Sequence, residues 1–179
     1  MKKKVLAIIP ARSGSKRILN KNIRLFSGKP LISYTIEHAL QSKIFDRVIV
    51  DTDSSDIVSI AKKYGAEAPF LRPKEMSGDG SRIGETISFL LQRLRKEEEY
   101  VPDIIALLQT TSPLRELEDI EKCYEIISNS KVKSVCTICE ISPWFYHLSS
   151  SDRLVLVNKK DGKTTNTQEA QRGYVLNGC

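Results

Sequence analysis

Residues 5–22, VLAIIPARSGSKRILNKN, join a short apolar run directly to a basic loop. The run Val5–Ile9 shows no alternation of apolar and polar residues, which predicts a strand buried on both faces. Four cations follow it within the loop: Arg12, Lys16, Arg17 and Lys21. Because ligands of open α/β sheets bind beyond the carboxyl ends of strands, this loop indicates a site for an anionic ligand.

Helical and strand patterns alternate after this loop. Helices are expected over 28–42, with Pro30 at the start, over 54–66, with Ser54 or Ser55 as the cap, over 83–94 and over 116–127. Strands are expected over 46–53, around Phe70, over 103–109 and over 132–139. Continuously apolar strands that alternate with helices are typical of a parallel sheet covered on both faces. The sequence therefore predicts a three-layer α/β fold with a mostly parallel sheet, in one domain over 1–179.

The alternation breaks over 141–172, where the sequence is polar and offers one short strand candidate at 154–157. We interpret this stretch as a late excursion from the domain. It holds three consecutive aromatic residues, Trp144, Phe145 and Tyr146, which could form a dimer contact or a sugar-binding wall. Because aromatic residues are enriched at interfaces, we favour a homodimer contact.

Composition excludes several classes of protein. The net charge is +6 over 179 residues, but the basic residues are scattered beside acidic ones, so no nucleic acid partner is expected. No stretch is long enough to cross a membrane. Lys2–Lys4 resemble the start of a signal peptide, but the apolar run ends at Pro10, so we expect a cytoplasmic protein.

Cys136 and Cys139 form a C-x-x-C sequence, which raises the question of zinc or redox chemistry. They fall in a predicted strand, where a spacing of three places the side chains on opposite faces. No second pair completes a zinc site, so buried thiols are favoured.

The loop after the first strand has the chemistry of a phosphate site. Ser13, Gly14 and Ser15 can offer backbone N–H groups, with Gly14 permitting an unusual turn. Arg12 can bind phosphate oxygens with two nitrogens. Neither a P-loop nor a dinucleotide G-x-G-x-x-G sequence is present, so a nucleotide site of another design is predicted. From charge alone, a solvated basic loop is the alternative.

Five stretches resemble, in order, the CMP-sugar synthetases, also called acylneuraminate cytidylyltransferases. They are IIPARSGSKRILNKNI (8–23), VIVDTDSSDIVSIAKKYGAEAPFLRP (48–73), GDGS (78–81), LLQTTSPLRELEDI (107–120) and YVLNG (174–178). The resemblance implies a Rossmann-like nucleotidyltransferase domain with a late dimerisation excursion. It also implies an enzyme that transfers CMP from CTP to the anomeric hydroxyl of a keto-sugar acid and releases pyrophosphate.

The same resemblance assigns roles by matched position. Arg12 and Lys21 would be catalytic, because they neutralise the triphosphate and the departing pyrophosphate. The stretch Ser13–Ser15 would contact the nucleotide. Asn22 would contact the nucleotide's sugar or base, and Arg72 would bind a carbonyl of the pyrimidine.

Three further positions complete the expected site. Ser81 would touch the nucleotide, cap the helix that follows, or do both. Gln109 ends an otherwise apolar strand, so its amide needs partners that a substrate could supply, and by resemblance it contacts the sugar acid. Thr111 would support that contact or shape the turn before Pro113.

The resemblance also implies Mg²⁺, but the family's metal-binding aspartate pair has no match before the chain stops at Cys179. Asp51 or Asp53 could bind metal, although an acidic pair before a helix is more often a cap.

Thr167 stands where the family has an arginine, and Arg172 lies nearby in the sequence. The alternative function is therefore a catalytically silent or truncated CTP-binding module. A uridylyl- or guanylyltransferase is a third hypothesis, and the identity of the sugar acid is left open.

Overall fold

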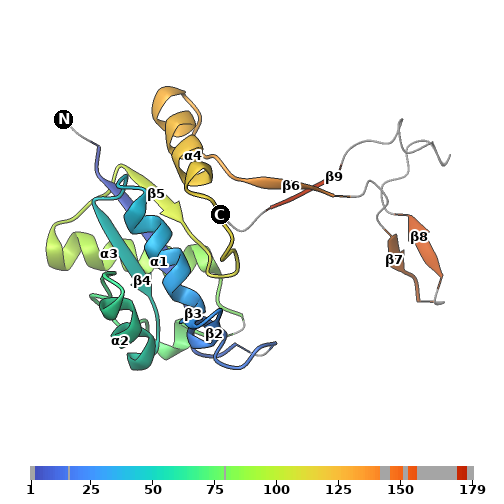
Figure 1. Cartoon of the computed structure of the whole chain (residues 1–179), viewed down its shortest axis with the longest axis horizontal. Coiled ribbons are helices and arrows are strands. Elements are labelled where there is room, and N and C mark those ends of the chain that lie inside the picture. The colour runs from blue at the N-terminus through green and yellow to red at the C-terminus, as the bar shows by residue number, and fades with distance from the viewer. Residues whose placement is uncertain are drawn as a thin grey trace. The chain divides into compact units, whose positions relative to one another are not determined.

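A computed structural model describes residues 3–15, 17–78, 80–141, 146–150, 153–156 and 173–176 (Figure 1). The chain divides into two compact units. One runs to Val135 and the other covers Cys136–Asn177, so the second unit begins before the predicted excursion at 141.

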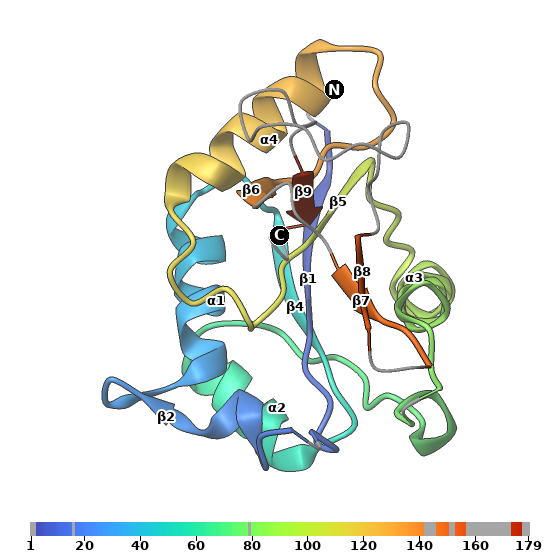
Figure 2. The same ribbon diagram turned by 90° about the vertical axis from the view of Figure 1, so that its right-hand side faces the viewer.

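The first unit is built on a parallel sheet of three strands in the order β4-β1-β5. The strands are β1 (Val5–Pro10), β4 (Arg47–Asp51) and β5 (Ile104–Leu107). Figure 2 shows β1 between its two partners. Because β1 is paired on both edges and covered on both faces, Val5–Ile9 are all buried, as their apolar run predicts.

Helices cover both faces of this sheet. Alternate residues of β1 point to opposite faces. Ala7 and Ile9 pack on one side with α1 (Leu31–Gln41), α2 (Ser55–Lys63) and α4 (Leu117–Asn129), and Leu6 and Ile8 pack on the other side with α3 (Ile83–Glu98). The predicted three-layer α/β architecture is therefore confirmed.

Short elements connect these layers. The 3-10 helix η1 (Lys21–Ile23) and the hairpin of β2 (Leu25–Phe26) and β3 (Lys29–Pro30) lead into α1, and the 3-10 helix η2 (Lys74–Met76) precedes α3. The strand predicted around Phe70 is wrong: two isolated bridges, Ile49 with Glu67 and Thr52 with Leu71, stand in its place. Pro69 lies between these bridges and has no N–H for a continuous ladder.

The described residues of the second unit form two antiparallel pairs of strands. One joins β6 (Ile138–Ile141) to β9 (Gly173–Leu176), and the other joins β7 (Tyr146–Leu148) to β8 (Leu154–Leu156). The strand predicted over 132–139 thus begins later, at Ile138, and runs antiparallel to its neighbour. The short strand predicted over 154–157 is confirmed as β8.

The prediction of buried thiols is wrong, because Cys136 and Cys139 are both exposed. Cys136 precedes β6, and β6 pairs with one neighbour only in the part of the chain that the structure describes. Trp144, Phe145, Thr167 and Arg172 lie outside the described residues. None of the helices in the described ranges has the length and apolar character that a membrane span requires.

Candidate active site

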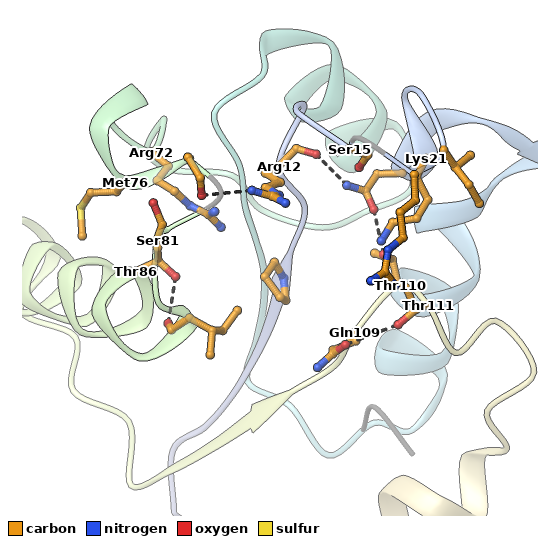
Figure 3. Close-up of a pocket in the computed structure, with 16 residues that line it drawn as sticks. Arg12, Ser15, Lys21, Arg72, Met76, Ser81, Thr86, Gln109, Thr110 and Thr111 are labelled. Atoms are coloured by element: carbon orange, nitrogen blue, oxygen red, sulfur yellow. Dashed lines mark hydrogen bonds between the residues drawn. The ribbon is translucent and has the colours of Figure 1, made fainter. Parts of the chain in front are cut away.

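A pocket of about 590 Å³ opens beyond the carboxyl ends of β1 and β5 (Figure 3). The chain crosses from β1 to β4 on one side and later returns to β5 on the other, so β1 and β5 flank the point where the strand order reverses. Open α/β sheets bind their ligands at such a point. The pocket brings together most of the predicted site residues: Arg12, Ser15, Lys21, Asn22, Arg72, Ser81, Gln109 and Thr111.

The pocket is strongly cationic. Arg12, Arg17, Lys21 and Arg72 line it, and no carboxylate does so among the described lining residues. Arg12 donates from Nη1 to the carbonyl oxygen of Gly78 over 3.0 Å, which ties the basic loop to the segment before α3. Burial lowers the pKa of Lys21, and the charges of Arg12 and Arg17 lower it further. An anionic ligand would relieve this repulsion.

The stretch Ser13–Ser15 does not form the predicted cradle of N–H groups. The N–H of Ser13 donates to Asp53 Oδ1 over 2.8 Å, and its hydroxyl donates to Asp53 Oδ2 over 2.7 Å. The N–H of Ser15 donates to the carbonyl oxygen of Ser13 over 2.9 Å. Gly14 is outside the left-handed region that only glycine adopts easily, so the predicted unusual turn is absent. Of these three residues, Ser15 alone lines the pocket.

Asn22 is buried and links the two strand ends. Its Nδ2 donates to the carbonyl oxygen of Arg12 over 2.9 Å, and its Oδ1 accepts from the hydroxyl of Thr110 over 2.8 Å. The sequence prediction gave Asn22 a nucleotide contact and omitted Thr110. A polar residue directly after an apolar strand is the signal that singled out Gln109, and it applies equally to Thr110.

Arg72 is only 8% exposed, so it is not a surface arginine that fixes a turn. Its Nη2 donates to Asp51 twice, over 2.6 Å to Oδ2 and over 2.8 Å to the backbone carbonyl. Burial raises the pKa of Asp51, and the hydrogen bond and charge of Arg72 offset part of that rise. Neither Asp51 nor Asp53 caps α2; Ser54 does, and accepts from the N–H of Ile57 over 3.4 Å.

Ser81 lines the pocket but does not cap α3, whose N-cap is Arg82 with no side-chain cap bond. Gln109 is exposed, and its Oε1 accepts from the hydroxyl of Thr111 over 3.4 Å. The backbone carbonyl of Gln109 accepts from Nη2 of Arg115, a buried arginine that the sequence prediction missed, over 3.0 Å. This arrangement holds the backbone of the turn and presents the Gln109 side chain toward the pocket.

The described residues do not fit a magnesium site of their own. Mg²⁺ prefers carboxylate and other oxygen ligands. No group of three or more His, Cys, Asp or Glu residues that could hold a metal occurs in the described part of the chain. The carboxylates nearest in sequence to the pocket strands are engaged, Asp51 by Arg72 and Asp53 by Ser13. The requirement for Mg²⁺ that the family resemblance implies stays a prediction.

Comparisons with known proteins agree with this geometry. The profile of the cytidylyltransferase family matches residues 6–175. The chain is 40% identical over 154 residues to CMP-N,N'-diacetyllegionaminic acid synthase of Legionella pneumophila. These aligned residues cover 85% of this chain and 66% of the relative. The chain is also 38% identical over 175 residues to pseudaminic acid cytidylyltransferase of Campylobacter jejuni. Here the aligned residues cover 96% of this chain and 74% of the relative.

The chain thus spans roughly two thirds of the length of the first relative and three quarters of the second. Its fold is similar to that of a CMP:2-keto-3-deoxy-manno-octonic acid synthetase complexed with CTP. The TM-score is 0.65, and the identity is 24% over 78% of this chain and 54% of that one. Nothing in these comparisons supports the alternative of a catalytically silent module.

Proposed function

Because this chain belongs to the cytidylyltransferase family, we propose that it transfers CMP from CTP to a sialic-type keto-sugar acid and releases pyrophosphate. The observation that carries this proposal is the cationic pocket at the ends of β1 and β5. Its size suits a small ligand, and its charge suits a triphosphate.

The pocket residues have separate tasks in such a reaction. The anomeric hydroxyl oxygen forms a bond to the α-phosphorus and releases its proton to water, and the bond from that phosphorus to the oxygen bridging to the β-phosphate breaks. Negative charge then accumulates on the leaving pyrophosphate. Arg12 and Lys21 would stabilise this charge, because both are fixed cations on the loop after β1.

The other side of the pocket would receive the acceptor. Gln109 offers an exposed amide with one donor group and one acceptor, and Thr111 holds its oxygen. These groups suit the hydroxyls of a sugar acid. Arg172, the candidate for binding the acid's carboxylate, lies outside the described residues.

We also propose a cytoplasmic homodimer, with the second unit as its interface. An isolated pair of strands is marginally stable in water, so such a pair needs a cover. The pair β6 and β9 exposes four large hydrophobic side chains: Ile138, Tyr174, Val175 and Leu176. Light scattering at micromolar concentration is expected to give twice the mass of the chain. A monomer at this concentration would argue against the interface.

The activity is tested by measuring pyrophosphate release from CTP, with and without Mg²⁺, in the presence of legionaminic, pseudaminic or N-acetylneuraminic acid. Release is expected with at least one acid, and Arg12→Ala is expected to lower the rate on the order of a hundredfold. CTP binding without release for any acid would instead favour the silent module. Release from UTP or GTP in place of CTP would favour the third hypothesis.

A further inference from the structure

Two oxygens of Asp51 hold a single nitrogen of Arg72. The carboxylate Oδ2 lies 2.6 Å from Arg72 Nη2, and the backbone carbonyl oxygen lies 2.8 Å from the same atom. Nη2 carries two hydrogens, so Asp51 supplies one acceptor for each. Both side chains are buried, with 5% and 6% of their surface exposed, and the ion pair is therefore little screened by solvent.

The remaining donors of Arg72 have no protein partner in the described part of the chain. Nε is buried and makes no hydrogen bond, and no hydrogen bond from Nη1 is formed there either. A buried donor without an acceptor is unfavourable, so structures rarely keep one without a reason. Because Arg72 lines the pocket, a bound ligand can supply the missing acceptor.

Asp51 stands on a rigid support. It ends β4, it is paired in register with Pro10 of β1, and its carbonyl oxygen also accepts the N–H of Ala11 over 2.9 Å. The same residue thus fixes both Arg72 and the first residue of the basic loop.

The ion pair divides the pocket electrostatically. The charge of Arg72 is balanced by Asp51 at close range, whereas Arg17 and Lys21 have no carboxylate beside them among the described lining residues. A polyphosphate is therefore attracted to Arg17 and Lys21 more than to Arg72. The pair of Arg72 and Asp51 has little net charge, and the donors of Arg72 that Asp51 does not use suit a neutral carbonyl acceptor.

We infer that Asp51 is a positioning residue that directs Arg72 to the carbonyl group of a pyrimidine and away from the phosphates of the nucleotide. This inference rests on the proposed function. It assigns two separable contributions to Asp51: an acceptor that orients the guanidinium, and a negative charge that keeps polyphosphate from binding Arg72.

Two substitutions separate these contributions. Asp51→Asn keeps an oxygen acceptor for Arg72 but removes the charge, and Asp51→Ala removes both. Glu67→Gln is the matched control, because it removes one carboxylate that pairs with Arg47 on the surface, outside the pocket. Calorimetry on each protein would give dissociation constants for CTP, UTP, ATP and inorganic tripolyphosphate, and circular dichroism would confirm that each variant is folded.

Asp51→Asn is expected to bind tripolyphosphate at least about threefold more tightly, because the charge of Arg72 is then no longer balanced by a carboxylate. Asp51→Ala is expected to lose roughly tenfold in affinity for CTP and UTP alike relative to ATP, because both pyrimidines carry the carbonyl and adenine does not. Glu67→Gln should leave all four constants unchanged.

Asp51 variants that bind every ligand as the unaltered protein does would overturn the inference. Equal weakening for CTP, ATP and tripolyphosphate would also overturn it, since a purely structural role weakens all ligands together. An unaltered protein that binds ATP as well as CTP would instead overturn the proposed function, and the inference with it. A selective unaltered protein whose Asp51 variants keep that selectivity would overturn the inference alone.

Discussion

Thr110 donates its hydroxyl hydrogen to the amide oxygen of Asn22 over 2.8 Å, and this buried bond joins the turn after β5 to the loop after β1. Asn22 extends the connection, because its amide nitrogen donates to the carbonyl oxygen of Arg12 over 2.9 Å. The two strand ends that flank the pocket are therefore held at a fixed separation by side chains rather than by the sheet alone.

Thr110→Val tests this bridge. Valine has nearly the same shape, so the main effect is to leave the buried Oδ1 of Asn22 without its partner. We expect the free energy of unfolding in urea to fall by about 1–3 kcal/mol. Thr111→Val is the matched control, because Thr111 is exposed and its hydroxyl lies 3.4 Å from Gln109 Oε1. It should change stability by less than about 0.5 kcal/mol. Equal losses in the two variants would argue against the bridge.

Arg72→Ala is expected to destabilise the fold as well as the ligand complex. It leaves the carboxylate of Asp51 buried without a counter-charge, which typically costs about 3–5 kcal/mol at neutral pH. Burial already raises the pKa of Asp51, and the loss of Arg72 removes the interaction that offsets this rise. The folded variant therefore binds a proton more readily than the unfolded chain, so its stability should increase as the pH falls.

Urea unfolding at about pH 7.5 and about pH 5 checks this sign, since both values lie above the ordinary aspartate pKa. The difference in stability between the unaltered protein and Arg72→Ala should be smaller at the lower pH. Lys122→Ala breaks an ion pair with Glu118 that is about 70% exposed on both sides, and it should change stability by less than about 0.5 kcal/mol at either pH. A pH-independent loss in Arg72→Ala would show that Asp51 is not the cause.

The architecture was predictable because local patterns determine it. The unbroken apolar run Val5–Ile9 identifies a strand buried on both faces, and Ser54, one of the two predicted cap residues, caps α2. The basic loop directly behind β1 identified the edge of the sheet where the pocket lies. The resemblance to the CMP-sugar synthetases is confirmed by the profile match over residues 6–175 and by the similarity to the two relatives.

The internal bonding of the site could not be predicted, because it depends on long-range contacts. Asp51 and Arg72 are 21 residues apart and meet only once β4 is in place. Asp53 accepts two hydrogen bonds from Ser13 because of the path that the loop after β1 takes, and no local sequence pattern predicts that path. The exposed Cys136 and Cys139 were misjudged because a single strand pattern does not reveal how many neighbours the strand has.

We expect Lys21 to make CTP binding sensitive to alkaline pH. Burial and the neighbouring charges of Arg12 and Arg17 lower its pKa, whereas bound phosphate favours the charged ammonium. CTP therefore binds the protonated lysine better, and its affinity should fall as the pH rises from about 8 towards the ordinary lysine pKa of about 10.4. Lys21→Arg should flatten this fall, because arginine stays protonated. Calorimetry across this range checks both, and the same slope in the two proteins would exclude Lys21 as the titrating group.

Arg12→Ala should weaken nucleotide binding in proportion to phosphate charge. Arg12 lines the pocket, and its contact with the Gly78 carbonyl is made through Nη1. A lost charged hydrogen bond is worth about 1.5–3 kcal/mol, so the dissociation constant for CTP should rise roughly ten- to hundredfold. CDP should be affected less and CMP least, because the guanidinium addresses phosphates beyond the first.

Lys62→Ala is the control, because it removes one positive charge from the exposed face of α2, outside the pocket. Calorimetry with CTP, CDP, CMP and cytidine gives the series. An equal loss for all four ligands would show that Arg12 shapes the pocket as a whole, and the phosphate assignment would then be withdrawn.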